Sequence, residues 1–238
     1  MTKKEQLKRV LNERRYITVA QVAEYLDVSQ HVARQYLYEF TASQQLFDAG
    51  YKVYSTIKPV FVLQHHSRVE NIRKMVTRAF PEIEFTIWNT QQLQPLYLHA
   101  QHNHHTFIDV EKIGLHPFYE RVKAEYRSTH FPGEHFEVYD NPVVIRPLLS
   151  RAPKGSEQKL LAKILVDMSL DLDEYTYLGR SEYWAVWRGL LAEYRVPFGW
   201  MIGYSKRRNR FEQLFRGLLD HGRTKDEAFI HHLLREEN

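Results

Sequence analysis

Residues 17–54 carry the clearest pattern in the chain and read ITVAQVAEYLDVSQHVARQYLYEFTASQQLFDAGYKVY. Thr18 is followed three residues later by Gln21, which is the spacing of a capping box and predicts the start of a helix. After a short turn, Ser29 is a good N-cap for a second helix that runs to about Phe40. The stretch therefore predicts two consecutive helices joined by a short turn.

The second of these helices is expected to be amphipathic. At about 100° per residue, its apolar and polar side chains fall on opposite faces. The residues expected to point inward are Val32, Ala33, Tyr36, Leu37 and Phe40. The residues expected on the outer side are Ser29, Gln30, His31, Arg34, Gln35 and Tyr38. Side chains of these outer types bond to base edges and phosphates, and no acidic residue precedes Glu39 on that face.

Residues 46–54 have the pattern of two short strands around a turn closed by Gly50. Two helices followed by a hairpin predict a winged helix-turn-helix domain over residues 1–58, whose second helix enters a DNA major groove. Tyr51 and Lys52, in the hairpin, are then expected to lean on the DNA backbone or the minor groove. The alternative is an interaction module that uses the same packing and never touches DNA.

Composition narrows the class of protein. The chain has 238 residues, of which 43% are hydrophobic, enough to bury the core of two domains or of one large domain. It has no cysteine, which excludes disulfides, thiol nucleophiles and cysteine-ligated zinc. No apolar run approaches the ~20 residues needed to span a bilayer, and the basic N-terminus lacks the apolar core of a signal peptide. We expect a cytoplasmic protein.

The net charge of +4 is unevenly distributed along the chain. Residues 1–58 carry +3, residues 59–150 carry −1 and residues 151–238 carry +2, as expected if nucleic acid meets the two ends. One basic run, at a predicted junction between helices, consists of Lys206, Arg207, Arg208 and Arg210. These cations are candidates for phosphate contacts, or for a solvated helix end favoured by the helix dipole.

Residues 59–238 predict a second domain of the α/β class, with a mainly parallel sheet and a helical C-terminal part. Strands are expected at 60–63, 85–88, 106–110, 136–139 and 143–146. Helices are expected at 67–80, 91–100 and 117–128, and from Ser156 onward, where a last helix starts at a capping box formed by Thr224 and Glu227.

Patterns of catalytic or metal-binding residues in this second domain are weak. His99, His102, His104 and His105 have irregular spacing in a loop, so a solvated polar loop is favoured over a zinc site. Asp109 and Glu111 lack the spacing of a nuclease strand, because Lys112 follows Glu111 directly. Ser156 and Lys159 match S-x-x-K without its companion motifs, which favours a simple helix start. No phosphate-binding glycine motif occurs. We therefore expect no enzyme activity, no metal and no cofactor.

Five segments together resemble the AbiEi-type antitoxins of bacterial and archaeal abortive-infection systems. They are FTIWNTQQL (85–93), FIDVEK (107–112), IRPLLSRAPKG (145–155), LAKILVDMSLD (161–171) and GYSKRRNRFEQL (203–214). The similarity runs from about residue 4 to residue 220, and its motifs are diffuse. The histidine-rich loop and the helix after Asp220 depart from the family pattern, which leaves pairing with a toxin open.

The resemblance implies a transcriptional autorepressor that is the antitoxin of a type IV toxin–antitoxin operon in phage defence. It implies an N-terminal winged helix that binds operator DNA, and a nucleotidyltransferase-like toxin that is antagonised indirectly. Winged-helix operators are usually repeated half-sites, so two copies are expected to bind together. Carried over by position, the antitoxin core includes Arg146, Ser150, Arg151, Lys163 and Asp167, whose roles are unknown beyond structural ion pairs. The alternatives are a nuclease or nucleotidyltransferase tethered by the winged helix, and a regulator without a toxin partner.

Overall fold

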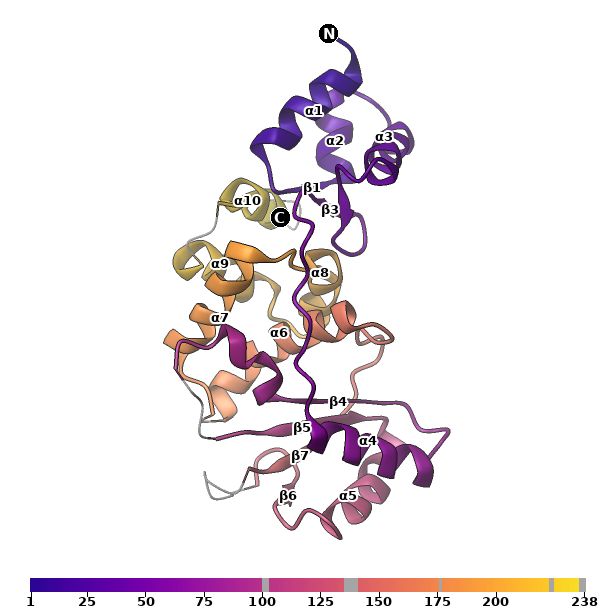
Figure 1. The fold of residues 1–238 in the computed structure, drawn as a ribbon, viewed down its shortest axis with the longest axis vertical. Coiled ribbons are helices and arrows are strands. Elements are labelled where there is room, and N and C mark those ends of the chain that lie inside the picture. Colours follow the sequence, from indigo (N-terminus) through magenta and orange to yellow (C-terminus); the bar gives the residue numbers. More distant parts are fainter. Residues whose placement is uncertain (100–102, 135–140, 176, 223–224, 236–238) are drawn as a thin grey trace. The chain divides into compact units, whose positions relative to one another are not determined.

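The computed structural model describes residues 1–99, 103–134, 141–175, 177–222 and 225–235 (Figure 1). The chain forms two compact units. The first unit comprises Met1–Phe61, Leu161–Val166 and Trp187–Asn238, and the second comprises Val62–Leu160 and Asp167–Val186. The predicted division into domains 1–58 and 59–238 stays a prediction. The two units are defined by their internal contacts, which do not tell which segments fold independently.

The N-terminal part of the first unit contains three helices and three short strands. They are α1 (Lys3–Glu13), β1 (Tyr16–Thr18), α2 (Val19–Leu26), α3 (Gln30–Ala42), β2 (Phe47–Asp48) and β3 (Val53–Ser55). The strands form one antiparallel sheet in the order β1-β3-β2. Helices α2 and α3 and the hairpin were predicted, whereas β1 was not. A core of apolar side chains, among them Leu7 of α1, Val22 of α2 and Leu37 of α3, holds the three helices together.

Both predicted caps in this part are present. Thr18 Oγ1 accepts from the backbone N–H of Gln21 at 3.0 Å, and Gln21 Oε1 accepts from the N–H of Thr18 at 2.9 Å. Ser29 Oγ accepts from the N–H of Val32 at 3.3 Å. These side chains satisfy backbone donors that the first turn of a helix leaves without partners.

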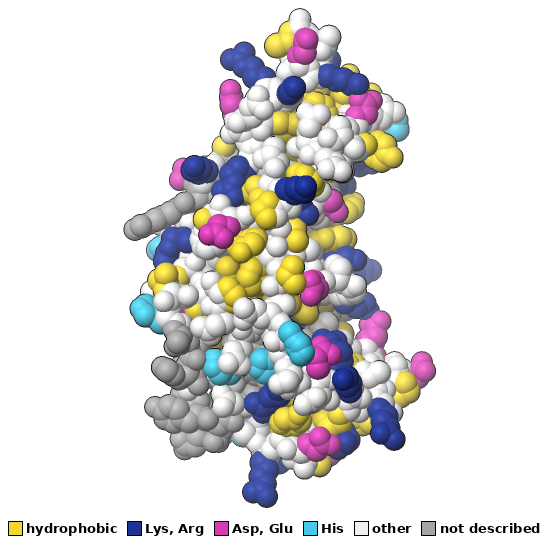
Figure 2. Space-filling view, in the orientation of Figure 1, with side chains coloured by type: hydrophobic (Ala, Val, Ile, Leu, Met, Phe, Trp, Pro, Cys, Tyr) yellow, Lys and Arg dark blue, Asp and Glu magenta, His cyan; other side chains and the backbone are white. Residues whose placement is uncertain are grey.

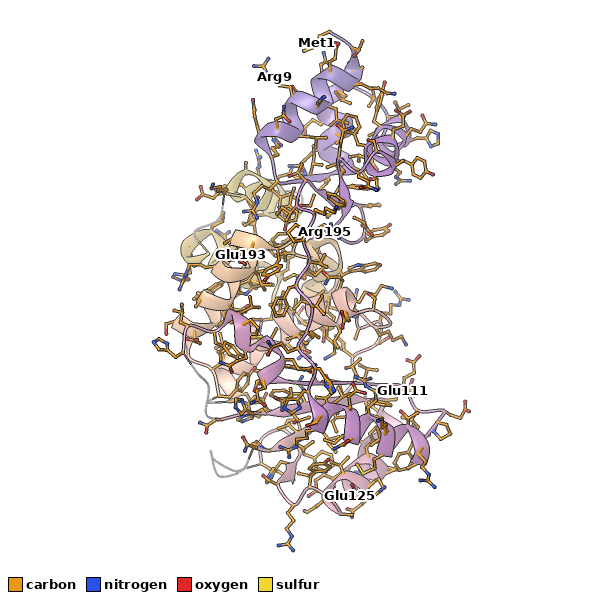
Figure 3. All side chains as sticks on the ribbon, in the orientation of Figure 1. Met1, Arg9, Glu111, Glu125, Glu193 and Arg195 are labelled. Atoms are coloured by element: carbon orange, nitrogen blue, oxygen red, sulfur yellow. The ribbon has the colours of Figure 1, made fainter. Side chains whose placement is uncertain are left out.

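C-terminal helices complete the first unit, namely the end of α7 (Arg180–Glu193), α8 (Phe198–Arg207), α9 (Phe211–His221) and α10 (Glu227–Arg235). Tyr16 of β1 is buried among them: its ring stacks on Phe229 with centroids 5.4 Å apart, and its hydroxyl accepts from the N–H of Val196 at 2.7 Å. Arg195, labelled in Figure 3, donates from Nη1 to the carbonyl oxygens of Ile57 at 3.0 Å and Lys58 at 3.1 Å. The N-terminal sheet of this unit is thus packed on its C-terminal helices.

The second unit contains a mixed four-stranded sheet in the order β4-β5-β7-β6. Its strands are β4 (Phe85–Asn89), β5 (Thr106–Val110), β6 (Thr129–His130) and β7 (Val143–Pro147). The β5–β7 and β6–β7 pairs are parallel and the β4–β5 pair is antiparallel, which confirms the prediction of a mainly parallel sheet. The helical elements of the unit are α4 (Ser67–Ala79), η1 (Thr90–Leu96), η2 (Lys112–Gly114), α5 (Leu115–Lys123), the two ends of α6 (Glu157–Glu174) and the first part of α7.

Helices α4 and α5 cover one face of this sheet (Figure 1). Ile108 of β5 and Ile145 of β7 point to that face and pack with Ile72 of α4 and Phe118 of α5. Because side chains alternate along a strand, the intervening residues of β5 and β7 point to the opposite face. That second face carries the charged side chains described below.

Several predicted elements were wrong. Residues 60–63 form no strand; Pro59, just before them, accepts from the N–H of Arg195 at 2.7 Å. The helix expected at 91–100 is the 3₁₀ helix η1, which contains Pro95, a residue without a backbone N–H. Strand β6 was missed. The predicted helix at 67–80 is α4, which His66 caps. The strand expected at 136–139 and the cap expected at Thr224 lie outside the described residues.

No helix within the described part of the chain is long and apolar enough to cross a membrane.

Candidate functional site

The outer face of α3 presents the predicted DNA-reading side chains to solvent. Ser29, Gln30, His31, Arg34, Gln35 and Tyr38 are all exposed, Tyr38 by 75%. The opposite face buries Ala33, Leu37 and Phe40, so the predicted amphipathicity is confirmed. Packing of one face therefore fixes which side chains the other face offers to a partner.

The side chains on this face differ in the hydrogen bonds and ion pairs that they already make within the protein. The hydroxyl of Ser29 is engaged as the helix cap. Gln35 Nε2 and His31 Nε2 lie 3.3 Å apart, one turn from each other along the helix. The first acidic residue on α3, Glu39, pairs with Lys4 of α1 at 2.5 Å. The pairing partly offsets the negative charge of Glu39 next to the exposed face.

The turn of the β2–β3 hairpin is held against the first turn of α8. Gly50 adopts φ = +98°, a conformation that favours glycine, and Lys52 adopts φ = +60°. The N–H of Gly199 donates to Ala49 O at 2.9 Å. A Cβ at Gly199 would lie 2.5 Å from the backbone N of Tyr51, so only glycine allows the two backbones to approach this closely. Tyr51 and Lys52 thus project from a turn whose position α8 determines, and Tyr51 is 64% exposed.

A groove of about 420 Å³ lies between α2, the start of α3, the hairpin and α8. Four of the predicted site residues line it: Gln30, Tyr51, Lys52 and Lys206. Lys206 is thereby brought to the hairpin although it belongs to a distant part of the sequence. Gly199, Ile202 and Gly203 line the same groove from α8. Ile202 and Gly203 lie three and four residues after Gly199, the spacing of one helix face.

The remaining cations of the basic run are placed differently. Arg207 is exposed, with its guanidinium 5.9 Å from the ring centre of Tyr204. Arg208 and Arg210 are half-buried, and Arg210 bonds to Gln213. None of the three lines the groove in the described structure. On the face drawn in Figure 2, Lys and Arg side chains are spread among polar ones and form no single continuous patch.

A buried ionic network in the second unit contains Arg146, one of the residues predicted from the antitoxin resemblance. The register of the sheet sets Arg146 of β7 beside Asp109 of β5, and Asp109 beside Thr86 of β4. Arg146 Nε donates to Asp109 Oδ1 at 2.9 Å, and Thr86 Oγ1 donates to Asp109 Oδ2 at 3.4 Å. The guanidinium also lies 4.3 Å from the ring centre of Phe107.

Two further carboxylates reach Arg146 from the C-terminal part of α6. Arg146 Nη1 donates to Asp171 Oδ1 at 2.8 Å, and Nη2 lies 3.7 Å from Asp167 Oδ2. Asp167 and Asp171 are four residues apart, so they share one helix face. Tyr177 donates from its hydroxyl to Asp171 Oδ2 at 3.1 Å. One cation therefore ties two strands of the sheet to the end of α6.

Burial determines the electrostatics of this network. Arg146 is 7% exposed, Asp109 is 4% exposed, and Asp167 and Asp171 are 1% exposed. Burial opposes the charge of Arg146, but its carboxylate neighbours outweigh burial and hold the pKa of the guanidinium well above its ordinary value. Burial raises the pKa of Asp171 to about 7, against the opposing effect of Arg146. Asp171 therefore titrates near neutral pH.

The sequence had identified only part of this network. Asp167 was assigned to the antitoxin core, and Asp109 was set aside as a nuclease residue. Asp171 was not among the predicted site residues. The i, i+4 spacing of Asp167 and Asp171 was a readable signal, whereas their common contact with Arg146 was not.

The other predicted antitoxin-core residues differ in burial. Ser150 and Arg151 are exposed in the loop after β7, where Arg151 adopts φ = +58°. Lys163 is buried, with 1% of its surface exposed, in the segment of α6 that belongs to the first unit.

The histidine-rich segment contains one buried imidazole. His105 is 1% exposed, and its ring centre lies 5.0 Å from that of Tyr177. Burial, and then the neighbouring His104, lower the pKa of His105 to about 4. His99 is exposed beside Glu182, and His102 lies outside the described residues. Across the described segments, no three His, Asp or Glu residues are arranged to hold a metal ion.

The Ser156 motif acts as a helix start. Ser156 Oγ accepts from the N–H of Lys159 at 3.3 Å and caps α6. The S-x-x-K spacing is thereby accounted for by capping.

Comparison with known proteins identifies a family without a known function. No curated protein matches the chain. A model of a family of unknown function, DUF6577, matches residues 32–223. The match starts within α3 and extends past the end of α9, so it includes the sheet of the second unit and the basic run of α8. The chain belongs to the DUF6577 family.

Proposed function

We propose that residues 1–58 form a winged-helix domain that binds double-stranded DNA. The observation that carries this proposal is the exposed face of α3, which offers Gln30, His31, Arg34, Gln35 and Tyr38 to solvent. The element order α1-β1-α2-α3-β2-β3, with a three-stranded sheet, is typical of winged helices and supports the assignment. In this reading, α3 enters the major groove and its side chains bond to base edges.

Phosphate contacts are proposed to come from the hairpin and from α8. Lys52 and Lys206 both line one groove beside the start of α3. Cations at such positions fix the register of a protein on DNA and make its affinity depend on salt. Arg207 extends the cationic surface along α8, whereas half-buried Arg208 and Arg210 contribute through the field of the helix end.

We further propose that the protein is a transcriptional autorepressor and the antitoxin of a type IV toxin–antitoxin operon. Support for this step comes from the sequence resemblance to AbiEi-type antitoxins. In this reading two copies bind repeated half-sites in the protein's own promoter. The second unit, with the network around Arg146, antagonises a nucleotidyltransferase-like toxin without a stable complex. A regulator that has no toxin partner is the alternative.

DNA binding is tested by fluorescence anisotropy on the protein's own upstream region, over a series of salt concentrations. Arg34→Ala is expected to weaken specific binding about five- to hundredfold if Arg34 makes a bidentate contact with a base, which is worth about 1–3 kcal/mol. If Arg34 contacts a phosphate instead, the salt slope falls by about one unit. Arg121→Ala in α5, an exposed arginine of the second unit, is the matched control.

Absence of binding by the wild-type protein would refute the DNA proposal, and so would equal binding by the Arg34 and Arg121 variants. The antitoxin proposal has a separate test. The gene adjacent to this one is expressed alone and together with it, and bacterial growth is measured. Growth arrest by the neighbour that this protein relieves supports an antitoxin. If expression of the neighbour does not affect growth, the result favours a regulator without a toxin partner.

A further inference from the structure

The groove beside the hairpin has the character of a small-molecule site as well as that of a DNA contact. Its volume of about 420 Å³ falls within the ~300–1,000 Å³ range of ligand pockets. Apolar side chains of Val53, Ile202, Phe211 and Leu233 line it, and these come from four different elements or connections. The charged phosphates of a DNA backbone would leave such an apolar lining without a matching partner.

The groove has few polar groups, and the charged ones are all positive. Lys52 and Lys206 supply two ammonium groups, while Tyr51 and Gln30 supply a hydroxyl and an amide. No carboxylate belongs to the described lining. An apolar surface with a small number of cationic and neutral polar groups is complementary to a ligand that has an apolar body and one negative charge.

We propose that this groove binds a small amphipathic anion, of the class of a medium-chain or aromatic carboxylate. The apolar body packs against Val53, Ile202 and Phe211, and the carboxylate pairs with Lys52 and Lys206. Atoms contributed by α8 are essential to the site, because Gly199, Ile202, Gly203 and Lys206 form one of its sides.

Occupation of the groove has a regulatory consequence, which rests on the proposed DNA-binding function. Gln30 begins α3 and Tyr51 and Lys52 project from the hairpin, so the ligand would engage groups that the proposed DNA complex also uses. An anion paired with both lysines removes their charge from the DNA contact. Ligand and operator therefore compete, and the ligand acts as an inducer.

Gly203 provides a direct test of the site. The atom nearest to a Cβ at Gly203 is Arg207 Nη1, at 3.5 Å, which is ordinary contact with a flexible side chain. Gly203 lines the groove from α8, so Gly203→Leu is designed to add a bulky side chain at that side. Gly203→Ala makes the same backbone change and leaves most of the groove open, so it is the matched control.

The probe is octanoate, with octanol as the uncharged control. Binding is followed by NMR through the methyl signals of Val53, Ile202 and Leu233 in the full-length protein. We expect octanoate to shift these signals with a dissociation constant of about 1 mM or lower. Gly203→Leu abolishes the shifts and Gly203→Ala retains them. Exchange of both lysines for glutamine weakens octanoate about fivefold and leaves octanol unchanged.

Three results would overturn the proposal. The first is that octanoate at ten times the expected dissociation constant shifts no methyl signals. The others are that Gly203→Leu and Gly203→Ala bind octanoate equally well, or that octanol binds as tightly as octanoate. The DNA arm is read separately. If the protein binds its operator, octanoate releases the operator DNA from the wild-type protein and not from the Gly203→Leu variant. If it binds no DNA, the methyl shifts still decide whether the groove holds an anion, so the two failures are distinguishable.

Discussion

Replacement of Arg146 by methionine tests the central feature of the second unit. Methionine keeps an unbranched side chain but removes a cation that lies within 4 Å of Asp109, Asp167 and Asp171. Three charge-assisted hydrogen bonds, of 2.9, 2.8 and 3.4 Å, are lost. Breaking a buried pair by removing one partner costs about 3–5 kcal/mol, because the other charge stays buried without compensation. For a chain of this size the midpoint of thermal unfolding falls by about 10 °C.

The cost should depend on pH in a defined direction. Arg146 lowers the pKa of Asp171, which burial raises to about 7 even in its presence. Without Arg146 the folded-state pKa of Asp171 rises further above its unfolded value. The folded variant then binds more protons than the unfolded chain, so its stability increases as pH falls. The destabilisation relative to wild type is therefore largest near pH 8 and becomes smaller towards pH 5.

Urea unfolding at pH 8 and pH 5, followed by circular dichroism, measures both effects. Hydrogen exchange of peptides from β5 and β7 reports the second unit by itself. Arg121→Met is the control, because the exposed Arg121–Glu125 pair of α5 is worth only about 0.3–0.5 kcal/mol. A loss of less than about 1 kcal/mol at both pH values would refute the assignment of Arg146 as the cation that holds this network together.

Two further predictions concern packing and pH. Gly199→Ala sets a Cβ 2.5 Å from the backbone N of Tyr51 and should cost about 1–3 kcal/mol in urea unfolding. Gly203→Ala, on the same helix, should be neutral or stabilising by up to about 1 kcal/mol, and equal losses in the two variants would contradict this packing. Because the pKa of His105 is about 4 in the folded state against 6.5 ordinarily, the folded protein binds fewer protons between these values. The contribution of neutral His105 to the free energy of unfolding is complete above pH 6.5 and is lost as pH falls towards 4. The free energy of unfolding therefore falls by about 2 kcal/mol between pH 7 and pH 5. His105→Phe should lack this part of the pH dependence, and an unchanged dependence would show that His105 does not cause it.

Local features of the fold could be predicted from the sequence. Thr18 with Gln21, Ser29, and Gly50 act on neighbours within three or four residues, so their spacing alone predicts two helix starts and a turn. The amphipathic pattern of α3 likewise determines which side chains are exposed, whatever packs against its inner face. The apolar run at 60–63 misled the prediction, because an apolar run does not specify a partner strand.

Contacts between distant segments depended on the tertiary structure. Arg146 meets Asp109, 37 residues away, because β5 and β7 pair in a parallel register, and it meets Asp171, 25 residues away, because the end of α6 reaches the same sheet face. Lys206 borders the groove with Lys52 because two glycines let the hairpin approach α8. Spacing along a sequence specifies interactions within a turn or a helix. Which distant groups share one environment follows only from the packing of whole elements, which buries them together.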